Sequence, residues 1–463
     1  MSPAGRQLGH TLSGIRPPAK IWSFVLPFLL ASCSPASQRL PAPAPSQKFA
    51  ELKQKIAQLR GLPFRREVSL NSVAEATSPL PGKTSVAYGT QPVDRLSRIY
   101  KRLGLLPEST DFVKALADYS RLEEIAAYRP ETESIVVAPE AARLGRVLAG
   151  ESNAKSEKIA AAFALTHALQ EQHFDWHQKA RTISPEDRQL ALRAVAQGDA
   201  VLVGWNYFHE GKQPPSREEQ ARAIGRLSGE LEKMAAGLPE LLRQKWVFPY
   251  IEGSQFVWWA YAAKGWDGVN ALFAEPPSST SQVLHPERYY LQREEPQRIV
   301  PWGLMRQIKT TPILEQRLGE ALIQVALLSR YSRKESVEIA AGWKGDHLWV
   351  YEADQNLVIA WLSVWSNEEH ALRFFRTYRD VLERQHRARF EPTGGGDRLH
   401  AETATGGSTV LQREGPIVLL LDGLKLPRAR ELAEGIWRDL DVGTPPELMP
   451  FDLGGRQSPR RSR

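Results

Sequence analysis

The sequence predicts an α+β fold, in which a mainly helical domain is followed by a smaller α+β domain. From about Phe49 to residue 299, apolar residues recur mostly at helical spacing. After about Val300, apolar strand-like runs stand between helical segments, which is the pattern of a small α+β domain. A chain of 463 residues has room for two such domains, and its 42% hydrophobic residues, with 13 Trp, can supply their cores.

The first domain, residues 49–299, is predicted to be built mainly from helices. The first two helical segments are each expected to end at a glycine, Gly61 and Gly104, because glycine commonly terminates helices. A short strand is expected at 133–140, and the proline-rich stretch 275–290 reads as a loop. The expected helices are 49–62, 93–106, 111–129, 156–177, 185–207, 216–235 and an apolar, buried one at 254–266.

The second domain, residues 300–443, is predicted to mix helices and strands. Gly394, Gly395 and Gly396 mark a linker, because no strand precedes them and no helix follows. Trp343, Trp349, Trp361 and Trp365 are expected to pack the core of this domain. The expected helices are 314–331, 367–386 and 428–440, and the expected strands are 347–353, 357–366 and 415–425.

The N-terminus predicts a lipoprotein signal peptide at residues 1–32. Three basic residues precede the apolar run Ile21–Ala31, which is too short to span a bilayer comfortably and fits the core of a signal peptide. The run ends in Leu30-Ala31-Ser32-Cys33, which resembles the bacterial lipobox, whose cysteine is acylated and becomes the mature N-terminus. Two acyl chains anchor a protein stably. The sequence therefore predicts lipidation at Cys33 and attachment to the cell envelope, with Ser34 favouring the outer membrane.

The ends of the chain also explain its positive charge. Residues 33–48 form a Pro/Ala-rich tether, and residues 444–463 form a basic tail that we expect to be disordered. Three of the seven excess positive charges lie in residues 1–32 and four lie in the last nine residues, so the part between them is neutral. A neutral body argues against nucleic acid as a partner, because phosphate binding needs clustered positive charge.

Several ordered segments between Val93 and His386 resemble a family of bacterial and archaeal zinc metallopeptidases of the gluzincin type. The metal-binding helix of that family typically reads H-E-L-T-H-A-L-Q-D-Q-H-F-D, where this chain has FALTHALQEQHFD at 163–175. A family segment E-G-D-A corresponds to QGDA at 197–200. The PPSST loop at 276–280 and GWKGD at 342–346 resemble further family segments. The resemblance implies a metallopeptidase-like scaffold for the first domain.

The same alignment implies that the zinc site is lost. Carried over by position, the first ligand is Phe163, the general base is Ala164 and the third ligand is Gln197, so that only the ligand His167 is kept. A catalytic zinc normally has three protein ligands and an open position for water. A phenyl ring donates no lone pair, a methyl group accepts no proton, and an amide is a weak ligand. No metal and no catalytic residue are therefore expected.

Other polar residues remain candidates for a ligand-binding cleft or a relocated metal. His167, Asp199 and His285 are the cleft candidates, and Phe163 is expected to make the cleft floor apolar. His173 and His177 are spaced i, i+4 on the predicted helix and form one edge of a metal site in the alternative reading. No glutamate lies between them to act as a base, so the simpler interpretation is polar residues at a helix end.

The sequence thus predicts a membrane-anchored, catalytically inactive metallopeptidase homologue. Such a pseudopeptidase would bind a peptide or an envelope protein on its scaffold. One alternative is an active, zinc-dependent peptidase or other hydrolase with a relocated metal site. The other alternative is a structural subunit of an envelope complex, without a cleft in use. We expect no nucleic-acid partner, and no cofactor unless the zinc alternative holds.

Overall fold

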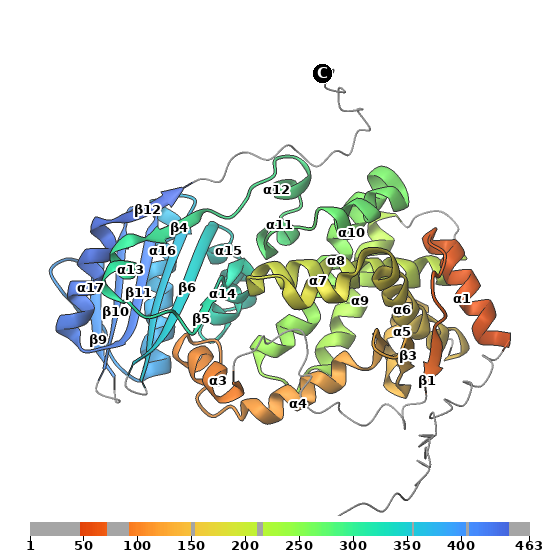
Figure 1. Ribbon diagram of the computed structural model, residues 1–463, viewed down its shortest axis with the longest axis horizontal. Helices are drawn as coiled ribbons and strands as arrows, with labels where there is room; N and C mark the ends of the chain where they lie inside the picture. The colour runs from red at the N-terminus through yellow and green to blue at the C-terminus, as the bar shows by residue number, and fades with distance from the viewer. Residues whose placement is uncertain are drawn as a thin grey trace, which may run out of the picture. The chain divides into compact units, whose positions relative to one another are not determined.

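Three long helices, α6 Asn153–Phe174, α8 Glu186–Phe208 and α10 Glu240–Ala274, form the centre of the N-terminal half in the computed structural model (Figure 1). The structure describes residues 47–71, 92–149, 153–210, 216–353, 356–403 and 407–443. Helix α8 packs against both α6 and α10. Gly198 and Gly253 let α8 and α10 approach closely, because a Cβ on Gly198 would lie 2.2 Å from the Gly253 carbonyl oxygen.

Shorter elements surround these three helices. Helix α1 packs against α6 and α8, and α9 begins with a capping box in which Ser216 and Glu219 bond each other's backbone N–H groups. A small sheet with the order β1-β3-β2 lies against α6 through β2 and β3. The surrounding elements are α1 Gln47–Arg60, β1 Ser69–Asn71, α3 Val93–Arg102, α4 Phe112–Glu123, β2 Ala126–Arg129, β3 Ser134–Val137, η1 Pro139–Ala141, α5 Ala142–Ala149, α7 Trp176–Thr182 and α9 Arg217–Met234.

A seven-stranded sheet dominates the C-terminal half, in the order β5-β6-β7-β11-β10-β9-β8, with antiparallel pairing throughout. Strands β12 and β4 form a separate antiparallel pair. The elements are α11 Thr280–Leu284, α12 Glu287–Tyr290, β4 Arg298–Pro301, α13 Trp302–Gln307, β5 Leu314–Gln316, α14 Gly319–Leu328, α15 Arg333–Ala340, β6 Trp343–Ala353, β7 Asn356–Trp365, α16 Glu368–His386, β8 Glu391–Pro392, β9 Arg398–Glu402, β10 Ser408–Glu414, β11 Ile417–Leu424, α17 Leu426–Arg438 and β12 Leu440–Gly443.

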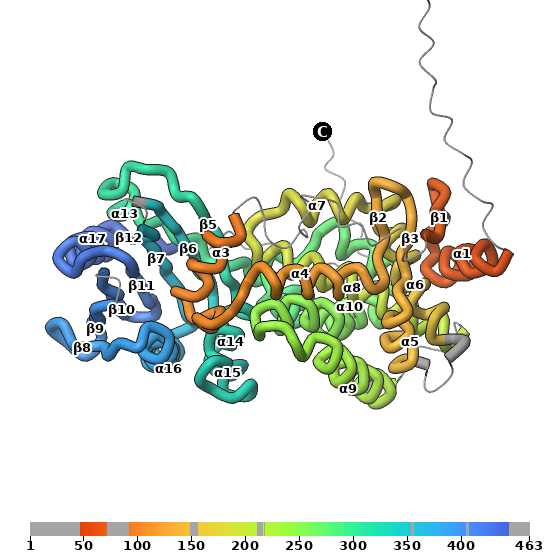
Figure 2. Tube along the Cα trace, turned by 90° about the horizontal axis from the view of Figure 1, so that it is seen from below, coloured from red at the N-terminus to blue at the C-terminus, as the bar shows by residue number. Residues whose placement is uncertain are grey.

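Strand β7 is buried on both of its faces, which explains its almost continuous apolar sequence. One set of alternate residues, including Ile359 and Trp361, belongs to the core that contains Phe374 of α16. The other set, including Ala360, belongs to the core that contains Leu432 of α17. Helices α16 and α17 therefore cover opposite faces of the sheet, as Figure 2 shows. The fold is α+β, as predicted.

The largest core cluster contains residues from both predicted domains. Leu96 and Tyr100 of α3 belong to it together with Trp361 and Phe374 of the C-terminal half. Helix α3 also binds the sheet through polar contacts, since Arg102 Nε donates to Asp422 Oδ2 over 2.5 Å. The core is thus continuous across the predicted boundary at residue 299.

Several predicted elements need correction. Residues 126–129 form strand β2 instead of continuing a helix, and 314–316 form strand β5 instead of starting one. The predicted loop 275–290 contains the short helices α11 and α12. Strands β9 and β10 and the pair β4–β12 were not predicted. These strands are short or carry polar residues, so their local sequence does not indicate a strand. Their conformation depends on pairing with other strands of the sheet.

The two ends of the chain lie outside the described residues. The signal peptide 1–32, Cys33, the tether 33–48 except for its last two residues, and the tail 444–463 therefore stay predictions from the sequence. Across the described ranges, no helix combines the length and the apolarity that crossing a bilayer requires.

Candidate functional site

Phe163 and Ala164 both lie in the packed interior. The Phe163 side chain is 1% exposed and its ring fits against Gly204 of α8, where an added Cβ would lie 2.4 Å from Phe163 Cε1. Gly204 follows Gln197 by seven residues, which is roughly 10 Å along a helix. Ala164 is fully buried in a core cluster that also contains residues of α1. The Phe163 ring therefore packs α6 against α8. It does not form the floor of a cleft, which corrects the prediction.

His167 and Gln197 are the two carried-over positions that contact each other directly. His167 Nε2 lies 3.1 Å from Gln197 Oε1, and His167 Nδ1 lies 2.8 Å from Gln170 Oε1. The amide nitrogen of Gln170 donates to the Ala196 carbonyl and to Asp199 Oδ2, so Gln170 Oε1 is left to accept from His167. The imidazole proton is consequently on Nδ1.

The burial of His167 fixes its charge as well. Burial lowers the pKa of His167 to about 4, against the opposing effect of its hydrogen bond with Gln170. The ring is therefore neutral at pH 7, and Nε2 carries a lone pair. A lone pair cannot bond an amide oxygen, so Nε2 and Gln197 form a hydrogen bond only with the amide turned to present its N–H group, an exchange of O and N that leaves the side chain in place. In this arrangement His167 Nε2, which corresponds to a zinc-binding nitrogen in the metallopeptidase family that the sequence resembles, is hydrogen-bonded to the Gln197 amide.

Asp199 is part of a buried ion pair and does not line a cleft. Arg60 Nε donates to Asp199 Oδ1 over 2.9 Å, and both side chains are fully buried. Burial raises the pKa of Asp199, and the positive charge of Arg60 opposes that rise. The guanidinium of Arg60 lies 4.6 Å from the centre of the Trp266 ring. Asp199 thus joins α8 to the end of α1, and Gln170 links this ion pair to His167.

These residues do not make a zinc site. One neutral imidazole and one amide converge, whereas a catalytic zinc normally requires three ligands. Among the residues that the structure describes, no three His, Cys, Asp or Glu side chains are grouped so that they could hold a metal ion. The donor set at the aligned positions therefore does not fit the metal that the family resemblance implies.

His173 and His177 do not share a helix face, because helix α6 ends at Phe174. Asp175 adopts a left-handed conformation with φ of 52°, and the chain restarts in α7. His173 bonds the Pro63 carbonyl, whereas His177 lies 3.2 Å from Glu171 Oε2. The alternative reading of an i, i+4 pair on one helix is therefore wrong, since the helix breaks at Asp175 and the two rings have different partners. The break also brings His177 to Glu171, a pairing that the sequence pattern did not reveal.

His285 belongs to a different cluster, between α12 and α14. Its Nε2 lies 2.8 Å from Oε1 of the fully buried Glu320, whose other oxygen accepts from Arg288. Nearby, Asp187 of α8 accepts from the backbone N–H of Thr280 in the PPSST segment. Asp187 precedes Gln197 by ten residues, or roughly 15 Å of helix. His285 is therefore not brought together with His167.

The comparisons with known proteins leave the function open. A family model described as a domain of unknown function (DUF8575) matches residues 309–433, inside the predicted second domain. No curated protein and no solved structure matches the chain.

Two aspartates that were not predicted organise the segments matched to the PPSST and GWKGD motifs. Asp187 accepts from Thr280 N and Oγ1 and, over 2.9 Å, from Arg317 Nε. Asp346 of GWKGD accepts from four donors, which are Leu318 N, Gly319 N, Trp343 Nε1 and Trp361 Nε1. Burial raises the pKa of Asp187 to about 6. These contacts therefore connect α8, α11 and α14 to the sheet. The GWKGD motif was the available sequence signal for Asp346, and no motif contained Asp187.

The four tryptophans of the second half that were expected in the core do lie there. Trp343, Trp349, Trp361 and Trp365 are each 2% exposed. In the apolar helix of the first half, Trp259 is 42% exposed and stacks on Tyr290 with nearly parallel rings. That helix is thus not buried on every side.

Proposed function

We propose that this protein is a membrane-anchored, catalytically inactive relative of gluzincin-type metallopeptidases, and that it acts as a binding scaffold in the cell envelope. The anchor in this proposal is acylated Cys33, on the anatomy of the N-terminal sequence. The body would bind a peptide or an envelope protein. No metal and no peptidase chemistry are part of the proposed function.

One observation carries the proposal, namely that His167 Nε2 is engaged by the Gln197 side chain at 3.1 Å. In a working site of this type, that nitrogen would bind zinc and residue 197 would be an anionic ligand. The amide instead satisfies a neutral imidazole, and no group at residue 164 accepts a proton from water. General-base assistance, typically worth about 10²–10⁴ in rate, is thereby lost together with the metal-activated water.

The packing around Phe163 supports the same proposal. Its ring fills the space over Gly204, so that the position aligned with the first ligand stabilises the contact between α6 and α8. A large buried aromatic side chain contributes several kcal/mol to stability, about 3–5 kcal/mol by truncation to alanine. A residue used in this way serves the scaffold and not the chemistry.

The test is the metal content of the purified full-length chain and of a restored variant. After dialysis against trace zinc, the native chain should hold far less than one zinc per chain, measured by plasma mass spectrometry. The triple variant Phe163→His, Ala164→Glu, Gln197→Glu should gain zinc, because three ligands would again be available on α6 and α8. Stoichiometric zinc in the native chain, removed by His167→Ala, would overturn the proposal.

The anchor is tested in the same preparation. Acyl labelling and membrane association should both be lost in Cys33→Ala. A Cys33→Ala chain that still fractionates with membranes would refute the lipid anchor while leaving the metal result untouched.

A further inference from the structure

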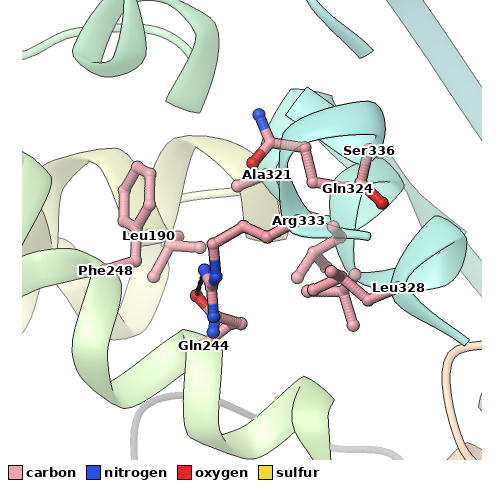
Figure 3. A pocket seen from close by; sticks show the side chains of 10 residues that line it. Leu190, Gln244, Phe248, Ala321, Gln324, Leu328, Arg333 and Ser336 are labelled. Atoms are coloured by element: carbon pink, nitrogen blue, oxygen red, sulfur yellow. Dashed lines mark hydrogen bonds between the residues drawn. The ribbon is translucent and has the colours of Figure 1, made fainter. Parts of the chain in front are cut away.

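The pocket between α10 and α14 offers little room for a partner. Figure 3 shows the side chains that line it, and its free volume of about 20 Å³ holds roughly one water molecule. A peptide or a lipid chain does not fit there. Exposed apolar side chains that lie together, by contrast, mark surfaces at which proteins meet other proteins or membranes.

Exposed apolar side chains gather where α10 meets α12. Trp259 of α10 is 42% exposed, and Leu291, which directly follows α12, is 64% exposed. The Trp259 ring stacks on Tyr290 with 6.0 Å between the ring centres, and the Tyr290 hydroxyl donates to the Phe256 carbonyl over 2.7 Å. These contacts hold α12 against α10, so Trp259 and Leu291 lie on neighbouring parts of one surface.

The exposed face of α10 carries no charge at this point. Ala262 and Ala263 are exposed one turn beyond Trp259, on the same side of the helix. Residues 253–263 include no charged side chain, whereas a helix face that meets only water usually carries several. Together with Leu291, these three residues of α10 form what we call the apolar patch.

The composition of the apolar patch suits a bilayer better than a protein partner. Two large and two small side chains are few compared with the surface of about 800 Å² that each partner buries in a stable protein interface. Tryptophan, moreover, is enriched at the headgroup level of membranes, where its ring is buried and its N–H group stays hydrogen-bonded. Apolar burial at that level is what holds a peripheral helix on a membrane.

The tether lets the apolar patch reach the membrane that would hold Cys33. Residues 33–46 can span at most about 50 Å when fully extended. They lead into α1, whose 14 residues are about 21 Å long. At the far end of α1, the Arg60 guanidinium lies 4.6 Å from the ring centre of Trp266, three residues beyond Ala263. The reach of the tether exceeds the length of α1, so the anchor and the patch can contact one bilayer.

The charge beside the apolar patch does not call for anionic lipid. Arg293, two residues after Leu291, lies 3.1 Å from Glu275 and 3.2 Å from Glu295. These two carboxylates already balance its charge, so attraction to anionic headgroups adds little. Contact with a zwitterionic phospholipid surface is therefore the chemistry that the patch favours.

We propose that the apolar patch lies in the headgroup region of the bilayer in which the acylated Cys33 is anchored, so that the body docks on the membrane in one orientation. This inference rests on the lipid anchor of the proposed function. The docked body would turn α4, which lies at the opposite edge from α12 in Figure 1, away from the membrane.

The experiment places an environment-sensitive nitrobenzoxadiazole dye on the acylated chain in phosphatidylcholine vesicles. Cys33 is the single cysteine, and acylation blocks its thiol, so Leu291→Cys supplies the one reactive thiol. The dye at residue 291 should emit at shorter wavelength and be quenched by a phospholipid with a spin label near the headgroup. Val113→Cys is the matched control, because residue 113 is 67% exposed on α4, and its dye should show neither effect.

Two variants test which side chains hold the contact. Trp259→Ser should lower the ratio of docked to undocked body by about tenfold, the effect of exposing part of a large apolar side chain again. Ala263→Glu puts a carboxylate into the patch and should act in the same direction without disturbing the stacking of Trp259 on Tyr290. Adding phosphatidylglycerol to the vesicles should leave the quenching at residue 291 unchanged.

Flotation of the chain with the vesicles reports the anchor, and quenching at residue 291 reports the docking. A chain that floats but is quenched equally at residues 113 and 291 overturns the docking and leaves the anchor intact. An emission shift at residue 291 without quenching by lipid means that a protein, such as a second copy of this chain, covers the patch, and also overturns the docking. A chain that does not float overturns the anchor and the docking together.

Discussion

Gly319 lies directly against Asp187, so that a Cβ added to residue 319 would fall 1.9 Å from Asp187 Oδ1. Gly319 also has φ of +73°, a conformation that other residues adopt at a cost. Asp187 is held in place by Thr280 and Arg317, so it cannot move away without losing these bonds. The contact joins α8 of the N-terminal half to the first residue of α14.

Gly319→Ala should therefore lower the free energy of unfolding by at least about 2 kcal/mol, from the steric overlap and the left-handed backbone together. Urea unfolding followed by circular dichroism measures this. Gly225→Ala is the matched control, because residue 225 is exposed on α9 with open space around it. The control should stabilise the chain by up to about 1 kcal/mol, through helix propensity. A Gly319→Ala chain as stable as the control would show that the close contact between residue 319 and Asp187 does not stabilise the packing of the two halves.

The parts of this fold that sequence reasoning predicted are those with long, regular patterns. Helices α6 and α8 and strand β7 were expected because their apolar residues repeat over many positions. Strand β10, by contrast, follows a stretch rich in Gly and Thr and gains its structure from pairing with β9 and β11. The end of α6 was missed because a single left-handed residue, Asp175, produces it, and aspartate adopts that conformation only in a suitable setting.

The candidate site was predictable only where the alignment placed two residues at metal-ligand positions. The contact between His167 and Gln197 follows from the aligned metal-ligand positions. The partner of Asp199 does not, because Arg60 is 139 residues away and meets it only when α1 packs on α8. Charge pairs of this kind depend on tertiary packing, which local spacing does not encode.

The neutral state of His167 predicts an acid-sensitive contribution to stability. Its pKa is lowered by burial to about 4, from 6.5 when unfolded, so the unfolded chain binds the extra proton first as the pH falls. The stability that comes from keeping His167 neutral is fully present above pH 6.5 and is lost progressively as the pH falls toward 4. Between pH 6.5 and pH 5 the free energy of unfolding should fall by about 1.6 kcal/mol, because the slope reaches 1.36 kcal/mol per pH unit only below the unfolded pKa.

The measurement is the free energy of unfolding of the native chain and of His167→Gln at both pH values. The variant should lose less stability on acidification, by nearly the amount given above. Taking the difference between the two proteins cancels the other groups, including His177, whose pKa burial also lowers. If the free energy of unfolding of the two proteins changed with pH in the same way, His167 would titrate normally and would not be buried between Gln170 and Gln197.

The ion pair between Arg60 and Asp199 should be far more sensitive to loss of one partner than to loss of both. Both side chains are fully buried, and Arg60 Nη1 and Nη2 have no hydrogen-bond partner among the described residues. Arg60→Met leaves the Asp199 carboxylate buried without a counter-charge, and should cost about 3–5 kcal/mol in unfolding free energy. The double variant Arg60→Met, Asp199→Leu removes both charges and places apolar atoms near Trp266, so it should cost less than the single change. Thermal and urea unfolding of the two variants measure the two losses. A purely additive effect would instead make the double variant less stable than Arg60→Met. A double variant less stable than Arg60→Met would indicate that Asp199 contributes through Gln170 to the region around His167 and not chiefly as the partner of Arg60.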